Sequence, residues 1–308
     1  MGARTALARL TDLATREVVP FGERIGRAIR RGADDLALRA LGPDFASRAL
    51  LLREELERKG GDPFGLDSDW SKYSAALAAV FHRGYFRTEC FGIEHVPPGR
   101  ALLISNHSGQ VPIDAAMINV AMFLDAKPPR FVRAMVEKWS QTLPFVGTFF
   151  NRVGQVVGVP ENCRLLLERD ELILVFPEGV RGVSKPFSKR YQLQEFGLGF
   201  MRLAIETRAP IVPVAVIGAE EQYVNVTNIE RFAKVFGLPS FPVIPQALVP
   251  FGQFPLPTRY RIHFGEPMWF DGDPDDEDAV MEQKVWLVRQ TVQSMLNRGL
   301  KERKSVFF

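Results

Sequence analysis

Cysteine is scarce in this chain of 308 residues, which contains only Cys90 and Cys163. Two cysteines so far apart form neither a disulfide framework nor one of the short spacings typical of metal sites. We therefore expect a reducing compartment, two ordinary half-buried thiols, no bound metal, and a fold that depends on its hydrophobic core.

Long apolar runs are also missing. No segment approaches the roughly 20 consecutive apolar residues that cross a bilayer. The first twenty residues carry arginines throughout and lack the apolar centre of a secretory signal. Ala6 stands where a myristoylation site has Ser or Thr. We expect a cytoplasmic protein that touches membranes only at their surface.

Three common motifs are absent: the P-loop, the Gly-x-Gly-x-x-Gly turn and the Gly-x-Ser-x-Gly elbow. The first two absences, with no basic helix carrying interleaved aromatics, leave nucleic-acid binding without support. The third argues against the usual serine-hydrolase route. The net charge of +3 and isoelectric point near 8.9 suit an anionic small molecule or an anionic membrane face.

Residues 1–83 read as a helical region. Leucines and isoleucines recur at helical spacing between arginines, and Pro20 and Gly60 end two of the segments. Two interpretations remain open: an amphipathic cap on a membrane, or a helical subdomain packed on the main core. The predicted helices are Met1–Glu17, Phe21–Arg31, Asp35–Lys59 and Trp70–His82.

From residue 84 to 308, strands alternate with helices, which predicts an α/β domain with a mostly parallel or mixed sheet flanked by helices and a C-terminal helix. Pro213 suggests that its strand lies at an edge or is irregular. The predicted strands are Phe86–Phe91, Ala101–Ile104, Phe131–Ala134, Gln155–Val159, Glu171–Phe176, Ile211–Ile217 and Arg259–Phe264. The predicted helices are Pro112–Phe123, Val136–Leu143, Asn162–Arg169, Leu193–Thr207 and Ala279–Leu300.

Two segments interrupt this rhythm. Residues 238–257 combine apolar and aromatic side chains with several prolines and carry no charge. Such a stretch is either a packed loop or a surface that touches lipid. The acidic run 271–278 leads into the last helix, where negative charge is favourable, and we interpret it as a helix cap rather than a metal site.

Of the four histidines, His82, His95 and His263 suit structural roles, whereas His107 follows the buried run Ala101–Ile104. Ligands of open α/β sheets bind beyond the carboxyl ends of strands. Pro112 forces a loop before the next helix, so that the carboxylate of Asp114 can fold back onto the imidazole.

Asp114 would then hold one ring nitrogen of His107 protonated and leave the other free as a base. The alternative is that Asp114 only complements a helix N-terminus. The backbone N–H groups of Ser108 and Gly109 are candidate oxyanion donors.

A second group follows another apolar strand: Glu178, Gly179 and Arg181, with Lys185 extending the positive charge. Arginine presents a planar fork to phosphate oxygens, so this group could grip a polyol phosphate. The alternative is a basic surface loop. Arg152, after a further apolar run, is another candidate for substrate binding.

Together these segments resemble the glycerolipid and lysophospholipid acyltransferase superfamily, which includes the 1-acylglycerol-3-phosphate acyltransferases. The resemblance covers roughly residues 84–270. It rests on four motifs in order: Asn106-His107 with a downstream Asp, Phe149-Phe150-Asn151-Arg152, Phe176-Pro177-Glu178-Gly179-x-Arg181, and Ala209-Pro210-Ile211-Val212-Pro213-Val214.

The resemblance implies a glycerol-3-phosphate acyltransferase-like fold and direct transfer of a fatty acyl group to a glycerol hydroxyl of a lysophosphatidate-like acceptor. His107 would be the base and Asp114 its partner, and the Glu178 block and Arg181 would bind the acceptor. The donor would be acyl-CoA or acyl-carrier protein, without a further cofactor. Membrane contact would come from the N-terminal helices and residues 238–257.

Two departures from the family pattern concern the acceptor. The family spacing is His-x4-Asp, whereas six residues separate His107 from Asp114, and Val180 and Gly182 replace the usual Thr and a common Ser. These changes resemble the mono- and diacylglycerol acyltransferase-like branch, so a neutral acceptor is an alternative. A non-catalytic lipid or acyl-carrier binding protein and a thioesterase or lipase are the others.

Overall fold

The computed structural model describes residues 32, 41, 43–108, 111–228 and 242–307. By its internal contacts the chain separates into two compact units, residues 1–47 and 48–308. The division into 1–83 and 84–308 stays a prediction. The helices predicted over 1–17 and 21–31 lie outside the described residues.

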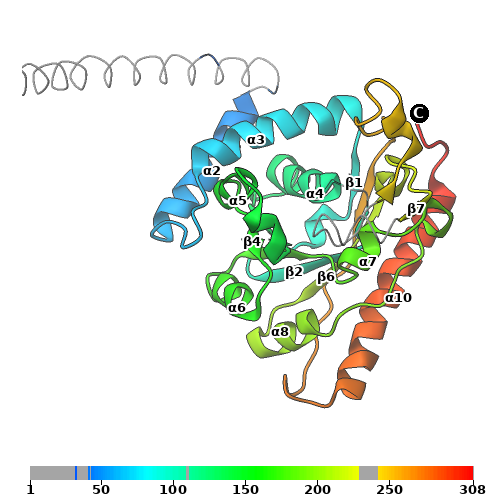
Figure 1. Cartoon of the computed structure of the whole chain (residues 1–308). Coiled ribbons are helices and arrows are strands. Elements are labelled where there is room, and N and C mark those ends of the chain that lie inside the picture. Colours follow the sequence, from blue (N-terminus) through cyan, green and yellow to red (C-terminus); the bar gives the residue numbers. More distant parts are fainter. Residues whose placement is uncertain (1–31, 33–40, 42, 109–110, 229–241, 308) are drawn as a thin grey trace, which may run out of the picture. The chain divides into compact units, whose positions relative to one another are not determined.

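Helices and strands alternate along the larger unit, as the sequence pattern predicted (Figure 1). The strands are β1 (Glu89–Phe91), β2 (Ala101–Ser105), β3 (Val132–Val136), β4 (Val156–Val157), β5 (Leu172–Val175), β6 (Ile211–Ile217), β7 (Thr227–Asn228), β8 (Pro242–Val243) and β9 (Arg261–Phe264). The α-helices are α2 (Pro43–Arg58), α3 (Ser68–Val80), α4 (Ile113–Leu124), α5 (Val146–Arg152), α6 (Pro160–Glu168), α7 (Val180–Val183), α8 (Gly199–Thr207) and α10 (Asp278–Glu302). Shorter turns are the π-helical η1 (Phe81–Tyr85) and the 3₁₀ turns η2 (Ile93–His95), η3 (Lys138–Thr142), η4 (Phe187–Lys189), η5 (Ala219–Glu221) and η6 (Pro245–Leu248).

The main sheet has the strand order β1-β9-β6-β2-β5-β3-β4, and β7 pairs with β8 in a separate two-stranded ribbon. Within the described residues, five neighbouring pairs of the main sheet run parallel and the β6–β9 pair runs antiparallel. The mostly parallel, mixed sheet of the predicted α/β fold is therefore confirmed. Because β2 and β5 are parallel neighbours, the residues that follow them meet at one edge of the sheet.

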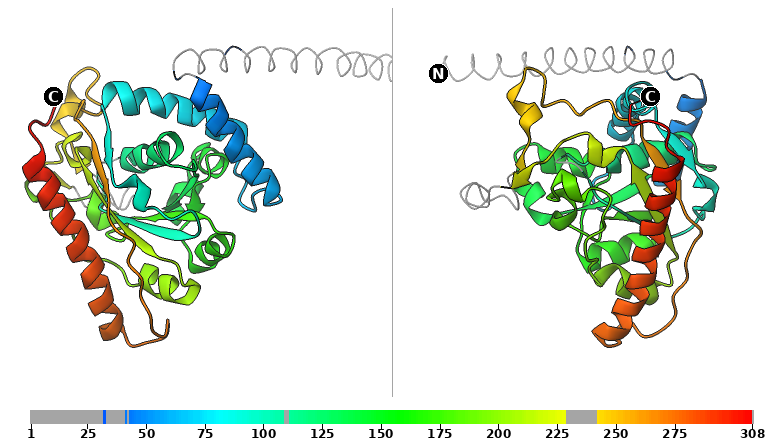
Figure 2. Two further views of the ribbon diagram at one scale, coloured as in Figure 1. Left: turned by 180° about the vertical axis from the view of Figure 1, so that it is seen from behind. Right: turned by 90° about the vertical axis from the view of Figure 1, so that its right-hand side faces the viewer.

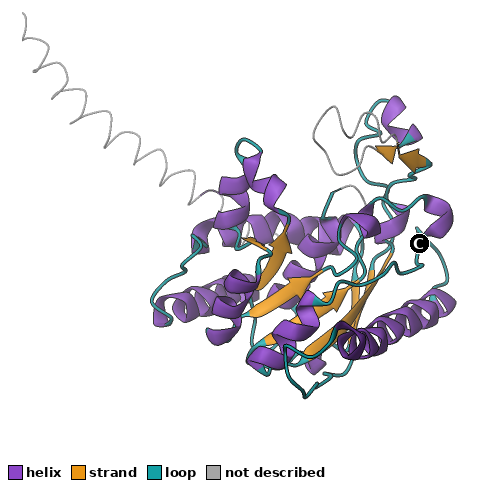
Figure 3. Cartoon of the chain, turned by 60° about the horizontal axis from the view of Figure 1, so that its bottom comes forward, coloured by secondary structure: helices purple, strands orange, loops and turns teal. Residues whose placement is uncertain are grey.

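Helices cover both faces of this sheet (Figure 3). On one face, α6, α8 and α10 pack with inward side chains of the central strands in a single apolar cluster, and α10 runs beside the sheet (Figure 2). On the other face, α4 packs against β3, and α3 packs on α4. Strands buried on both faces are apolar at every position, which explains the uninterrupted run Ala101–Ile104.

Of the two alternatives predicted for the strand of Pro213, an edge position or an irregularity, the structure shows the irregularity, because β6 is central in the sheet. The Pro213 carbonyl accepts from Gly265 N–H, so its nitrogen also faces β9. The segment that pairs with β6 has one extra residue there, because Val214 pairs with Phe264 whereas Ile211 pairs with Met268. The missing N–H therefore falls where the ladder is already interrupted.

Several predicted boundaries shift where the chain finds other partners for its backbone. The helix predicted to begin at Leu193 begins at Gly199, because the N–H groups of Leu193 and Gln194 donate to side chains of Gln293 and Glu178. The strand predicted from Phe86 begins at Glu89, because the π-helical turn Phe81–Tyr85 continues α3.

Candidate active site

The end of the central strand β2 is pinned to its neighbour by Asn106. The side-chain amide of this buried residue donates to Val216 O (3.0 Å), and its oxygen accepts from Val216 N–H (2.8 Å). This pair of bonds continues the β2–β6 ladder one residue further and fixes the direction in which the next residue, His107, leaves the sheet. The sequence placed Asn106 in a motif, but only the fold shows this role.

The imidazole of His107 meets the carboxylate of Asp114, as predicted. Nδ1 lies 2.8 Å from Asp114 Oδ2, and Asp114 is fully buried in the first turn of α4. The same carboxylate accepts N–H bonds from Ser108 (2.9 Å) and Ala115 (2.8 Å). Because a carboxylate only accepts, this network assigns the ring proton to Nδ1 and leaves Nε2 as an acceptor.

The ring of His107 is held flat against Phe176, which follows β5. The ring centroids are 4.0 Å apart and the planes differ by 17°. The His107 side chain keeps 17% of its surface exposed, whereas that of Asp114 keeps none. The imidazole can therefore meet a substrate while its orienting acid is shielded from water.

Glu178 supports the main chain of His107. Its Oε1 accepts from His107 N–H (3.2 Å), its Oε2 accepts from Gln194 N–H (2.8 Å), and Lys185 Nζ lies 3.3 Å from Oε2. Glu178 and Lys185, both predicted to bind the acceptor, are buried in this cluster. The structure thus places both residues near His107, but their polar groups bind other groups of the protein and not a substrate.

Two glycines allow this turn to form. Gly179 has φ +55° and ψ −144°, a backbone conformation that other residues rarely adopt. A Cβ on Gly182 would lie 2.9 Å from Glu178 Cβ and 3.3 Å from its Oε1. Gly179 was predicted to bind substrate. In the structure its backbone conformation shapes the turn that carries Glu178.

The two predicted arginines are exposed and have partners of their own. Arg181 pairs with Glu195, 3.1 Å from Oε2, and donates to its carbonyl. The guanidinium of Arg152 lies over the Trp70 ring on α3, 5.0 Å from its centroid. The Arg152 guanidinium therefore contacts α3 and not the residues around His107.

The predicted oxyanion donors have different outcomes. The N–H of Ser108 is engaged by Asp114, so it is not free to stabilise an oxyanion in this geometry. Gly109 lies outside the described residues. A small polar pocket opens beside Ser108, and its lining includes Lys185, Arg190 and Glu220.

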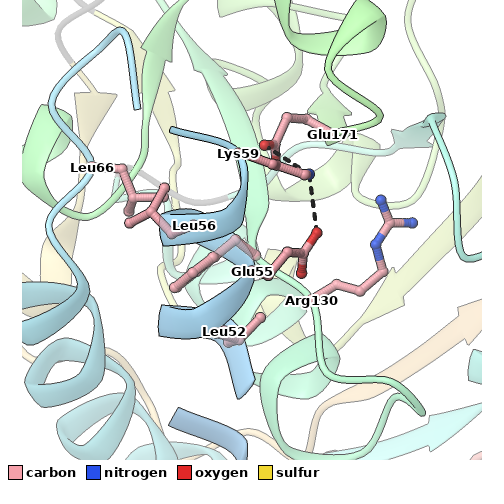
Figure 4. A pocket seen from close by; sticks show the side chains of 8 residues that line it. Leu52, Glu55, Leu56, Lys59, Leu66, Arg130 and Glu171 are labelled. Atoms are coloured by element: carbon pink, nitrogen blue, oxygen red, sulfur yellow. Dashed lines mark hydrogen bonds and ion pairs between the residues drawn. The ribbon is translucent and has the colours of Figure 1, made fainter. Parts of the chain in front are cut away.

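A second pocket lies at the opposite edge of the sheet, where Phe131 and Glu171 precede β3 and β5 (Figure 4). Lys59, which directly follows α2, lies 3.0 Å from Glu55 and 3.1 Å from Glu171 there. These paired charges attach α2 to the sheet, and the pocket has no part in the site around His107.

One group in the described part of the chain combines metal-ligand residue types: His82, Cys90 and Asp125, with ligand atoms within 4.8 Å of one another. Sequence spacing did not predict this group. Burial raises the pKa of the Cys90 thiol to about 12, so little of the metal-binding thiolate is present at neutral pH. The strand β1 that carries Cys90 is three places from β2 in the sheet.

Comparisons with known proteins show the family to which the chain belongs. The family model described as Acyltransferase matches residues 87–217. An uncharacterized protein of Mycobacterium tuberculosis is 38% identical over 256 residues, which cover 80% of this chain and 71% of that protein. A Gallus gallus protein described as a DGAT1/2-independent enzyme synthesizing storage lipids is 26% identical, covering 84% of this chain and 78% of its own length.

Among solved structures, the 1-acyl-sn-glycerophosphate acyltransferase PlsC from Thermotoga maritima has a similar fold. The TM-score is 0.50 at 17% identity, covering 86% of this chain and 90% of PlsC. The chain therefore belongs to the acyltransferase family, as its motifs predicted, and is an acyltransferase. Among the described residues, no helix is both long enough and apolar enough to cross a bilayer.

Proposed function

We propose that this protein transfers a fatty acyl group from a thioester donor, acyl-CoA or acyl-carrier protein, to a glycerol hydroxyl, with His107 as general base. The observation that carries the proposal is the 2.8 Å contact between His107 Nδ1 and the buried carboxylate of Asp114. It leaves the partly exposed ring with one acceptor nitrogen, which is what removal of a hydroxyl proton requires.

The chemistry then needs no covalent enzyme intermediate. Nε2 of His107 takes the hydroxyl proton as the oxygen attacks the thioester carbonyl, and Asp114 stabilises the imidazolium. When the tetrahedral intermediate collapses, the C–S bond breaks and the imidazolium returns the proton to the leaving thiolate. A positioned base of this kind contributes about 10²–10⁴ in rate.

For the acceptor, we propose a neutral mono- or diacylglycerol in preference to a lysophospholipid. Arg152 lies on Trp70, Arg181 is paired with Glu195, and Lys185 is buried between carboxylates. None of the three predicted phosphate ligands is thus an unpaired cation directed at His107. The storage-lipid description of the Gallus gallus relative supports a neutral acceptor.

We also propose that the enzyme works at a membrane surface. In residues 242–257, Leu248 is 88% exposed and Phe251 81% exposed, and Phe254 is exposed as well. This segment lies beside the end of α3, where Leu77 and Val80 are exposed, and Tyr85 Oη donates to Pro255 O (2.6 Å) (Figure 2). We call these five apolar residues the apolar rim: Leu77, Val80, Leu248, Phe251 and Phe254.

The test is a product assay on lipid vesicles with labelled acyl-CoA and acyl-carrier protein, and with monoacylglycerol, diacylglycerol, lysophosphatidate and other lysophospholipids as acceptors. We expect transfer to the neutral acceptors. His107→Ala should lower kcat by about 10²–10⁴, and Asp114→Asn should lower it less, with folding unchanged.

His95→Gln, at a turn remote from β2, is the matched control and should keep wild-type kcat. Preferential acylation of lysophosphatidate would overturn the acceptor but not the mechanism. An undiminished rate in His107→Ala would overturn the mechanism, and rapid acyl-CoA hydrolysis unaffected by any acceptor would identify a thioesterase.

A further inference from the structure

Lys185 lies beside Ser108 in a buried cluster of charged side chains. Only 5% of its side chain is exposed. Its Nζ is 3.3 Å from Glu178 Oε2, 3.3 Å from Glu220 Oε1 and 3.4 Å from the Gln192 carbonyl. A lysine ammonium has three N–H donors, and three protein oxygens lie within reach of them. No donor is left over for a phosphate of the acceptor.

The two carboxylates that Lys185 joins hold different parts of the chain. Glu178 accepts from the N–H of His107 and of Gln194. Glu220, in η5 after β6, accepts from Tyr191 N–H (2.8 Å). Lys185 therefore connects the residues after β5 with those after β6, and its charge offsets the repulsion between two buried acids.

The electrostatics of Glu220 show how much this cation matters. Burial raises the pKa of Glu220 to about 7, the charge of Glu178 acts in the same direction, and Lys185 and the Tyr191 N–H act against it. Without Lys185, the two carboxylates would share a buried site with no cation between them, so that Glu220 would either repel Glu178 or take up a proton. Displacement of the Glu178 carboxylate would weaken its bond to His107 N–H.

We propose that Lys185 is a positioning residue: by pairing with both Glu178 and Glu220 it fixes the Glu178 carboxylate where it accepts from His107 N–H, and so holds the main chain of His107 in place. This inference rests on the proposed role of His107 as base. It assigns to Lys185 an effect on the rate of transfer to every acceptor, in place of the predicted binding of a phosphate.

Kinetics on two acceptors separate the two roles. For Lys185→Met we expect kcat to fall at least tenfold, by the same factor with monoacylglycerol and with lysophosphatidate, while both KM values stay within about twofold. A phosphate ligand would instead raise KM for lysophosphatidate alone, and that result would overturn the proposal. Lys301→Met, an exposed lysine in the last turn of α10, is the matched control.

A second variant separates positioning from a general loss of structure. In Lys185→Met/Glu220→Gln the second acid is neutral, while its amide oxygen still accepts from Tyr191 N–H. We expect this double variant to recover at least threefold in kcat over Lys185→Met, and Lys185→Arg to retain more activity than Lys185→Met. A double variant worse than Lys185→Met would contradict the proposal. If Lys185→Met fails to fold, the kcat of the double variant is compared with the kcat of the wild-type enzyme.

A measurement that does not depend on catalytic turnover separates the positioning role of Lys185 from the proposed acyl transfer. The His107 ring ¹Hε1 resonance, assigned by its loss in His107→Gln, should shift in Lys185→Met and return toward its original position in the double variant. If the wild-type enzyme acylates nothing but the resonance shifts, the proposed function fails and positioning stands. If the enzyme is active and Lys185→Met changes neither kcat nor the resonance, positioning fails.

Discussion

Two buried carboxylates hold the chain around His107 by accepting hydrogen bonds from main-chain N–H groups. Asp114 accepts from Ser108 and Ala115, and Glu178 accepts from His107 and Gln194. Bonds to ionised acceptors are stronger than those between neutral groups. At the residue scale, the site therefore depends on acids that organise loops beyond strand ends as much as on the imidazole itself.

The role of Glu178 predicts a large effect of a small substitution nearby. Gly182→Ala would place a Cβ 2.9 Å from Glu178 Cβ and push its carboxylate from His107 N–H. We expect kcat to fall at least tenfold and the free energy of unfolding to fall by about 1–3 kcal/mol. Gly197→Ala, whose Cβ would meet its nearest atom at 3.9 Å, is the control for both assays. Equal activities of the two variants would count against the Glu178 contact.

His82 predicts a pH-dependent contribution to stability. Burial lowers the pKa of His82 to about 4, and the charge of Arg83 acts in the same direction. The unfolded state, with a pKa near 6.5, therefore binds the proton first. This contribution is complete above pH 6.5 and is lost, up to about 3 kcal/mol, as pH falls toward 4.

Urea unfolding of the wild-type protein and His82→Leu at pH 7.5, 6 and 4.5 tests this expectation. The free energy of unfolding of the variant should decline less as pH falls. Parallel declines in the two proteins would show that His82 does not titrate in this range.

At the scale of elements, the buried Arg133 and the half-buried Arg169 attach the α2–α3 connection to the rest of the fold. Arg133 of β3, fully buried, donates to Gly154 O (2.7 Å) and pairs with Asp62 Oδ2 at 2.5 Å. Arg169 donates to the carbonyls of Lys59 and Gly61 at the C-terminal end of α2. These contacts fix a helix on the sheet through polar groups that no apolar periodicity reveals.

The buried pair of Arg133 with Asp62 predicts a strong and testable destabilisation. Asp62→Asn leaves the Arg133 charge without its partner, and we expect the free energy of unfolding to fall by about 3–5 kcal/mol. Glu57→Gln, which breaks the exposed pair between Arg53 and Glu57, should cost less than about 1 kcal/mol. Similar losses in chemical unfolding of the two variants would refute the buried pair's importance.

At the scale of the whole molecule, the apolar rim gathers residues distant in sequence, from α3 and from the segment 242–257. For the proposed lipid acceptor, such a surface would bring the enzyme to the membrane that holds the acceptor. The segment 242–257 fits the interpretation of the chargeless stretch as a lipid-touching surface.

Membrane binding should therefore depend on the rim. Burying a phenylalanine contributes about 1.5–3 kcal/mol, so Phe251→Ser/Phe254→Ser should weaken binding to phosphatidylcholine vesicles at least tenfold. In vesicle sedimentation, Trp286→Ser on α10, which removes an exposed aromatic from another surface, should bind like the wild-type protein. Unchanged binding of the double variant would exclude the rim as the contact.

The sequence by itself determined what local chemistry dictates. Apolar runs and their period located the α/β alternation, since a strand buried on both faces must be apolar throughout. The Pro112 loop predicted that Asp114 could return to His107, and four motifs in order identified the acyltransferase family. These features depend on residues close together in the chain or on the order of motifs along it, and both can be read directly from the sequence.

Only the tertiary structure decided the neighbours. Charge alone predicted Lys185 as a ligand of the substrate, but its place between Glu178 and Glu220 follows from how β5 and β6 lie in the sheet. Pro213 indicated either an edge strand or an irregularity, and the central position of β6, which leaves the irregularity, depends on pairing with β2 and β9. The physical reason is common to both: an isolated residue type specifies what it can bond, and packing specifies which partner it meets.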